Sequence, residues 1–113
     1  MKKNIIFAIC AMAMTSCQSP TLYSWYGSED ATYTYTKRGT DETLEKAMQQ
    51  YEKVLKKQKG LRKVVPPGVN AEYGYLLCKA GKKVEGLTLL RAEIQAYPES
   101  EKFISRIIKQ LEK

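Results

Sequence analysis

The chain has no histidine and only three cysteines among its 113 residues. The absence of histidine excludes Ser-His-Asp and Cys-His catalysis, and it excludes histidine-ligated metal sites. The seven glycines do not form a phosphate-binding loop. The acidic residues are scattered among lysines at spacings that fit surface pairs along helices. We therefore predict no catalytic residue, no metal site, no cofactor and no small-molecule substrate, and we expect that the protein is not an enzyme.

Long apolar runs are also scarce. The longest, Ile5–Met14, has about ten residues, whereas a helix needs about twenty to cross a bilayer. Lys2 and Lys3 precede this run, and Ser16 and Cys17 follow it. A basic start, a short apolar run and a small residue directly before a cysteine are typical of a lipoprotein export signal. We predict that residues 1–16 are removed and that Cys17 carries lipid. The alternative is an ordinary secretory signal followed by a chance cysteine.

Lipid on Cys17 determines the expected location. Acyl chains on one residue anchor a protein to a membrane without spanning it. Gln18 lacks the acidic character of an inner-membrane retention signal, so we expect the outer membrane of the cell envelope, with the domain facing the periplasm. Export argues against a nucleic-acid partner. Cys10 leaves with the signal, and Cys78 then remains alone; we expect it to be a small buried hydrophobe.

The remaining chain predicts an all-α fold. Apolar residues recur at helical spacing from Thr40 or Asp41 to Gly60, and again in residues 67–80, 84–97 and 99–112. Pro67 fits the first turn of its helix.

Residues 28–38 allow two interpretations. Thr32–Thr36 alternates like a strand, but Ser28 as cap, acidic residues in the first turn, basic residues in the last and Gly39 after the end favour a helix. We favour the helix. The expected organisation is a signal at 1–16, a lipidated tether with an aromatic segment at 17–27 and a helical domain at 28–113.

The hairpin expected over residues 69–98 resembles a tetratricopeptide repeat. Gly74 and Gly86 occupy the positions of small residues, Gly81 that of the turn glycine and Pro98 that of the terminal proline. Small residues allow two helices to approach closely. The preceding helices fit an earlier pair, and the last helix fits a cap. A stable stack usually needs about three pairs, so either the cap closes the core or a partner completes it.

Two surface features are candidates for contact with partners. The candidate protein-binding surface is aromatic: Tyr23, Trp25, Tyr26, Tyr73, Tyr75 and Tyr97. The candidate surface for anionic lipid is basic: Lys53, Lys56, Lys57, Lys59, Arg62 and Lys63. Each has a simpler alternative, because aromatic side chains also cover the ends of helical stacks, and lysines near a helix C-terminus are often solvated surface.

Five segments are distinctive in combination: Leu22–Tyr26, Thr40–Leu44, Val65–Gly68, Ala71–Leu76 and Tyr97–Ser100. Together they resemble a family of small bacterial lipoproteins that is catalogued only as a domain of unknown function. The resemblance covers residues 17–113 and carries no catalytic or binding residues with it. Members of that family tend to be encoded beside a lipoprotein similar to the curli secretion channel and another small lipoprotein. The resemblance therefore implies an envelope protein partner.

Three functional hypotheses follow. The first is a non-enzymatic accessory or adaptor subunit of an outer-membrane lipoprotein or secretion assembly, held at the membrane by Cys17. The second is a structural lipoprotein that contacts anionic lipid or lipopolysaccharide through its basic residues. The third is an enzyme whose site the sequence does not reveal.

Overall fold

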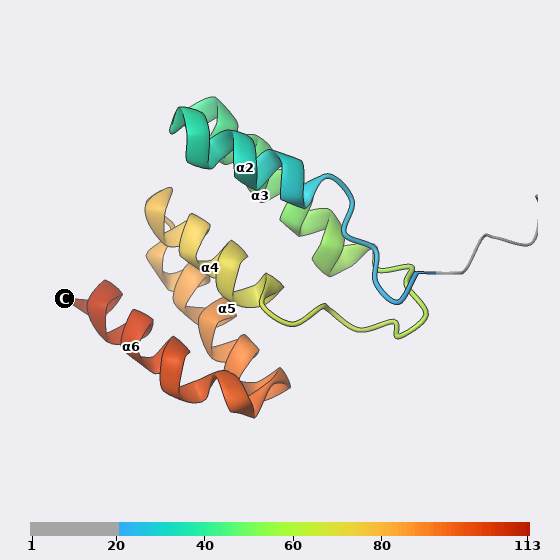
Figure 1. Ribbon diagram of the computed structural model, residues 1–113. Helices are drawn as coiled ribbons and strands as arrows, with labels where there is room; N and C mark the ends of the chain where they lie inside the picture. Colours follow the sequence, from blue (N-terminus) through green and yellow to red (C-terminus); the bar gives the residue numbers. More distant parts are fainter. Residues whose placement is uncertain (1–20) are drawn as a thin grey trace, which may run out of the picture.

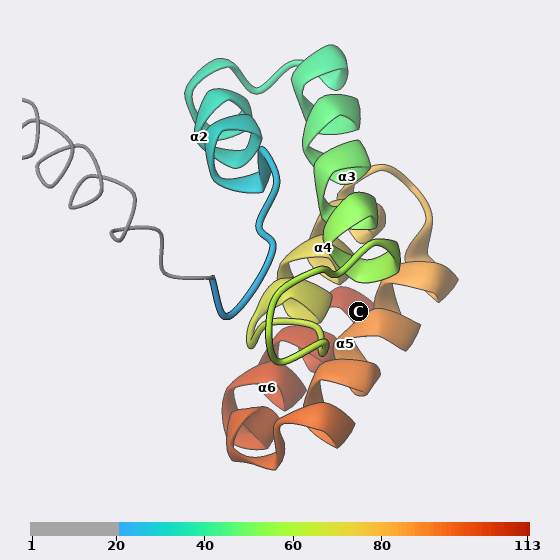
Figure 2. The same ribbon diagram turned by 90° about the vertical axis from the view of Figure 1, so that its right-hand side faces the viewer.

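The computed structural model describes residues 21–113, so the predicted export signal and Cys17 lie outside the described residues. Every regular element in this range is helical (Figures 1 and 2). The elements are α2 (Ser28–Arg38), α3 (Asp41–Lys56), α4 (Val69–Lys79), α5 (Lys83–Ala96), the short 3-10 helix η2 (Pro98–Ser100) and α6 (Glu101–Glu112). The predicted all-α fold is confirmed: α2 and α3 form one hairpin, α4 and α5 form a second, and α6 packs against α5 as a closing helix.

The helix interpretation of residues 28–38 is confirmed by α2. Its first turn is acidic and its last turn is basic, and Gly39 follows with φ 64° and donates its N–H to the Tyr35 carbonyl. The expected capping role of Ser28 is wrong. Ser28 is the first helical residue, and its hydroxyl donates instead to the Trp25 carbonyl, 2.7 Å away.

Helix α3 begins as predicted and ends earlier than predicted. Thr40 caps its start, and its side chain forms a reciprocal capping box with Thr43. The helix ends at Lys56 rather than near Gly60. The residues after Lys56 leave the helix because they bind the N-terminal segment. A Cβ on Gly60 would lie 2.2 Å from the Leu22 carbonyl oxygen, so this glycine permits a close contact and does not terminate a helix.

A long loop, residues 57–68, connects α3 to α4. Pro67 was expected in the first turn of α4, but it precedes the helix. Gly68 stands between Pro67 and Val69 with φ 90°, a left-handed conformation that an α-helix cannot include. The helix therefore starts at Val69.

The α4–α5 hairpin is closest where two glycines face each other. A Cβ on Gly74 would lie 2.6 Å from the Gly86 carbonyl oxygen, and a Cβ on Gly86 would lie 2.4 Å from both the Gly74 carbonyl oxygen and Cys78 Sγ. These are the roles that the tetratricopeptide spacing predicts. Cys78 is partly buried against the core, and burial raises the pKa of its thiol, as expected of a small hydrophobe.

The core has two parts, and α4 contributes to both. The first part joins α3 to α4, with α2 packed against it through Ala31 and Tyr35; its buried residues are Leu44, Ala47, Tyr51, Val54, Val69 and Leu76. The second joins α5 to α6, with Ala71 and Cys78 of α4 packed against it; its buried residues are Leu87, Leu90, Ile104 and Ile108.

Two apolar residues at helical spacing remain outside the core. Val84 is 80% exposed and Phe103 is 67% exposed, because each lies to the side of the buried face of its helix.

Candidate functional site

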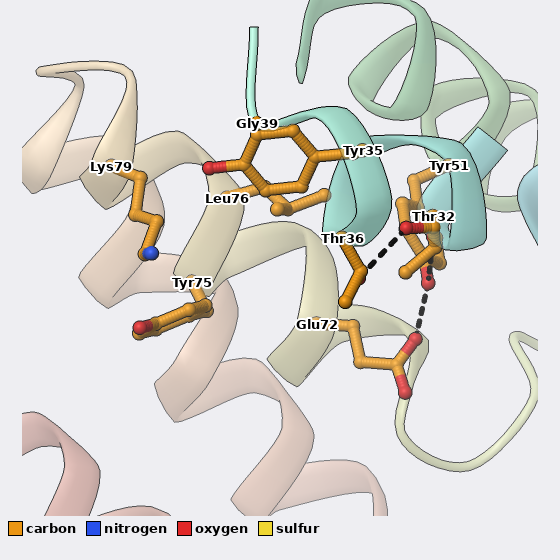
Figure 3. Close-up of a pocket in the computed structure, with 9 residues that line it drawn as sticks. All are labelled: Thr32, Tyr35, Thr36, Gly39, Tyr51, Glu72, Tyr75, Leu76 and Lys79. Carbon is orange, nitrogen blue, oxygen red and sulfur yellow. Dashed lines mark hydrogen bonds between the residues drawn. The ribbon is translucent and has the colours of Figure 1, made fainter. Parts of the chain in front are cut away.

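A groove opens between α2 and α4, with Tyr51 of α3 between them (Figure 3). Its volume is about 480 Å³. Its lining residues are Thr32, Tyr35, Thr36, Gly39, Tyr51, Glu72, Tyr75, Leu76 and Lys79. Aromatic rings, hydroxyls, one carboxylate and one ammonium are thus gathered in one concave surface. Such a combination can hold a peptide segment by apolar packing and oriented hydrogen bonds.

A chain of hydrogen bonds fixes the interior of this groove. Thr32 Oγ1 donates to the Tyr51 hydroxyl at 2.9 Å, and that hydroxyl donates to the Glu72 carboxylate. Tyr51 is only 3% exposed. Burial, followed by the hydrogen bond to Glu72, raises the pKa of Tyr51 to about 12. The phenol therefore stays protonated at neutral pH and links α2, α3 and α4.

A second depression adjoins the first. It lies between α4 and α6, has a volume of about 370 Å³ and is lined by Ala71, Glu72, Tyr75, Ile107 and Gln110. Glu72 and Tyr75 line both depressions, so the two form one continuous surface across α2, α4 and α6. We call this surface the three-helix groove. Lys79 Nζ lies 5.3 Å from the centre of the Tyr75 ring, where a cation–π contact favours the ring's position between the two depressions.

The aromatic residues singled out from the sequence do not form one surface. Tyr75 is 41% exposed and lies in the three-helix groove. Tyr73 instead packs against the first core and stacks on Tyr51, with ring centres 6.3 Å apart. Tyr97 donates its hydroxyl to the Val65 carbonyl at 2.6 Å.

The other three aromatic residues, Tyr23, Trp25 and Tyr26, belong to a segment that is attached to the long loop. The N–H groups of Leu61 and Arg62 donate to the carbonyls of Thr21 and Leu22 at 3.1 and 3.2 Å. Gln58 binds both the N–H and the carbonyl of Ser24, at 2.5 and 3.1 Å. We call residues 21–26 the docked segment. In Figure 1 it is the blue stretch that runs beside the yellow-green loop.

Tyrosine hydroxyls of the docked segment add to this attachment. The Tyr26 hydroxyl donates to the Lys57 carbonyl. Arg62 Nη1 donates to the Tyr23 hydroxyl at 3.1 Å, and this hydrogen bond raises the pKa of Arg62. The structure thus joins two of the predicted aromatic residues, Tyr23 and Tyr26, to two of the predicted basic residues, Arg62 and Lys57, which the sequence presented as separate features.

All six predicted basic residues are exposed, but they differ in their partners. Lys56 forms an ion pair with Glu52 at 2.5 Å, one turn earlier on α3. No ion pair in the described part of the chain involves Lys53, Lys57, Lys59, Arg62 or Lys63. Four of them, Lys57, Lys59, Arg62 and Lys63, lie on the long loop beside the docked segment.

Sequence reasoning missed two acidic residues. Glu72 is the carboxylate of the three-helix groove, and its position three residues before Tyr75 gave no signal because its partners come from two other helices. Glu93 is 2% exposed, and its carboxylate accepts a hydrogen bond from the Gly68 N–H at 2.7 Å. A signal existed for Glu93, since it lies three residues after Leu90, on the buried face of α5.

Residues 21–113 contain no group of three His, Cys, Asp or Glu side chains that could share a metal ion. No helix in the same range combines the length and the apolar character needed to cross a bilayer.

The fold and the groove define an all-α protein built from stacked helical hairpins. Residues 22–107 match a family described as a domain of unknown function, DUF4810. Because the match covers most of the chain, the protein belongs to the DUF4810 family. Nothing matched in the comparisons with curated proteins and with solved structures.

Proposed function

We propose that this protein is a lipid-anchored envelope lipoprotein that acts as a non-enzymatic adaptor. Lipid on Cys17 holds the helical domain at the outer membrane, on its periplasmic side. The three-helix groove binds a segment of another envelope protein.

One observation carries the adaptor proposal: Glu72 and Tyr75 line both depressions, so two adjacent depressions follow one another across α2, α4 and α6. A surface that involves three helices suits an extended or helical protein segment better than a small molecule. Tyr35 and Tyr75 supply large rings that lose little entropy when a partner covers them. Glu72 and Lys79 offer opposite charges on α4 for orienting the segment.

The expected partner is a lipoprotein similar to the curli secretion channel, or a neighbouring small lipoprotein. The gene context of the lipoprotein family that the sequence resembles supports this choice. A lipid-anchored adaptor and such a partner would share one membrane surface, which raises their local concentration.

The anchor is tested by metabolic labelling with a palmitate analogue. We expect label on the protein and none on the Cys17→Ala variant. An unlabelled protein that is still processed and membrane-bound would contradict the anchor.

The groove is tested by photo-crosslinking in intact cells, with p-benzoylphenylalanine in place of single tyrosines. We expect one dominant envelope-protein adduct from position 75. Position 33 is the matched control, because Tyr33 is 67% exposed on α2 and does not line the groove. Equal adducts from both positions, or none from position 75, would contradict the adaptor proposal.

A further inference from the structure

We infer that the docked segment and the long loop form a second membrane contact, which lays this end of the domain on an anionic phospholipid surface. The contact surface comprises residues 21–26 and 57–64, and we call it the N-terminal patch. The inference rests on the proposed anchor at Cys17 and adds an orientation for the domain.

The chain path brings the N-terminal patch close to the anchor. Thr21 is hydrogen-bonded to Leu61 and follows Cys17 by four residues. Four residues span at most about 14 Å. Acyl chains on Cys17 therefore keep Thr21 within about 14 Å of the bilayer surface, and Leu61 of the long loop is hydrogen-bonded to Thr21.

The N-terminal patch also carries several large apolar side chains that are exposed. Five of the exposed large apolar side chains in residues 21–113 belong to it: Leu22 at 57%, Trp25 at 37%, Tyr26 at 42%, Leu61 at 60% and Val64 at 50% exposed. Exposed apolar side chains that gather on one surface mark contact sites. Tryptophan and tyrosine are enriched at the level of lipid headgroups, because their rings are apolar and their polar atoms remain hydrated.

The charge of the N-terminal patch is entirely positive. Lys57, Lys59, Arg62 and Lys63 are exposed, and the sequence has no acidic residue between Glu52 and Glu72 or between residues 21 and 28. Basic residues near a leaflet of anionic lipid each strengthen binding about fivefold. Apolar and aromatic side chains combined with unpaired cations are the composition of surfaces that lie in the membrane interface.

This contact gives the domain a direction. Helix α3 runs 16 residues from Asp41 to the long loop, a length of about 24 Å. The turns at 39–40 and 80–82 lie at the opposite end of the hairpins from the N-terminal patch (Figure 1). The Lys79 end of the three-helix groove therefore lies at the end of the domain that faces away from the bilayer.

Trp25 is the only tryptophan of the chain, so its fluorescence reports on the N-terminal patch alone. The purified acylated protein is reconstituted into vesicles of brominated phosphatidylcholine, with or without brominated phosphatidylglycerol. We expect stronger quenching of Trp25 when phosphatidylglycerol is present, and loss of this difference at about 1 M salt, where the Debye length is about 3 Å.

Charge-reversed variants locate the effect. Lys59→Glu with Lys63→Glu leaves two positive and two negative charges on the N-terminal patch, so it should abolish most of the quenching that depends on phosphatidylglycerol. Lys102→Glu with Lys109→Glu makes the same charge change on exposed positions of α6 and should leave the quenching unchanged. Circular dichroism checks that both variants remain folded.

The possible outcomes separate the patch from the anchor. Equal quenching in the two lipids, or an equal loss in both double variants, overturns the patch contact. The intact mass of the same sample shows independently whether the protein carries acyl groups. A mass without acyl groups overturns the anchor and the inference that rests on it, whereas an acylated protein with unquenched Trp25 overturns the patch contact alone.

Discussion

The carboxylate of Glu93 holds the backbone N–H of Gly68 at 2.7 Å, across 25 positions of the chain. One turn later, at the C-cap of α5, Tyr97 donates its hydroxyl to the Val65 carbonyl at 2.6 Å. One side chain of α5 and one at its C-cap therefore bind the two sides of the Pro66–Pro67 turn. The entry to α4, and with it the position of the three-helix groove, depends on this pair of contacts.

Removing this contact should destabilise the fold. Glu93→Ala leaves the partly buried Gly68 N–H without its acceptor, so we expect a loss of about 1–2 kcal/mol in the free energy of unfolding. Urea denaturation measures the loss, and Glu99→Ala on exposed η2 is the control, expected within about 0.5 kcal/mol of the wild type. The losses from Glu93→Ala and Tyr97→Phe should not add, because both act on the same turn. Strict additivity would show that the two contacts act separately.

Tyr51 should stabilise the protein in a pH-dependent manner. Its pKa is about 12 in the folded chain and about 10 in an unfolded chain. Because the folded state holds the proton more tightly, this contribution is fully present below pH about 10 and is lost as the pH rises toward about 12. Tyr51→Phe removes the hydroxyl that links Thr32 to Glu72, and should cost about 1–2 kcal/mol at neutral pH.

The difference in the free energy of unfolding between the wild type and Tyr51→Phe should therefore become smaller above pH about 10. Denaturation curves recorded across this range measure it. Tyr33→Phe, at an exposed position of α2, should change stability by less than about 0.5 kcal/mol at any of these pH values. If the free energies of unfolding of the wild type and Tyr51→Phe differ by the same amount at every pH, the raised pKa of Tyr51 is contradicted.

Gly86→Ala tests the close approach of α4 and α5. In an ordinary helix this substitution stabilises by about 1 kcal/mol. Here the added Cβ would lie 2.4 Å from the Gly74 carbonyl oxygen, so we expect a loss of about 1–3 kcal/mol. Thr88→Ala, on the exposed face of α5, provides the comparison and should be nearly neutral. Stabilisation by Gly86→Ala would mean that the helices are farther apart than described.

Gly60→Ala should release the docked segment without unfolding the helices. The added Cβ would lie 2.2 Å from the Leu22 carbonyl oxygen and 2.4 Å from Tyr23 Cα. Hydrogen exchange should accelerate at the amides of Leu61 and Arg62, which donate to that segment. Amides of the buried Leu90 and Val54 serve as internal controls and should keep their protection. Faster exchange at all four amides would point to global destabilisation instead.

Local signals predicted the helices well because they act over one or two turns. The threonines of α2 favoured a strand by propensity, yet the helix forms. Thr34 and Thr36 donate their hydroxyls to the carbonyls of Asp30 and Thr32 at 2.8 and 2.9 Å, so these side chains are satisfied within the helix. The helix is also favoured by its acidic first turn, its basic last turn and Gly39 after its end. These signals outweighed the strand-like alternation of Thr32–Thr36.

The candidate sites were harder to predict because their parts are distant in the sequence. The groove combines Thr32, Tyr51 and Glu72, and no spacing rule links residues from three helices. The docked segment depends on Gly60, but a glycine at this position of the sequence equally predicts the end of a helix. Glu93 was detectable as an acidic residue on an apolar face, but its partner, a backbone N–H at Gly68, leaves no trace in the sequence.

Helix α4 contributes side chains to both parts of the core and to both depressions of the groove. Neither hairpin can lose α4 and keep its buried surface, so unfolding should occur in a single cooperative transition rather than one hairpin at a time. A partner segment that settles on α4 would then stabilise the whole domain against denaturation and proteolysis. A small chain of this design would be most resistant to degradation when it is assembled.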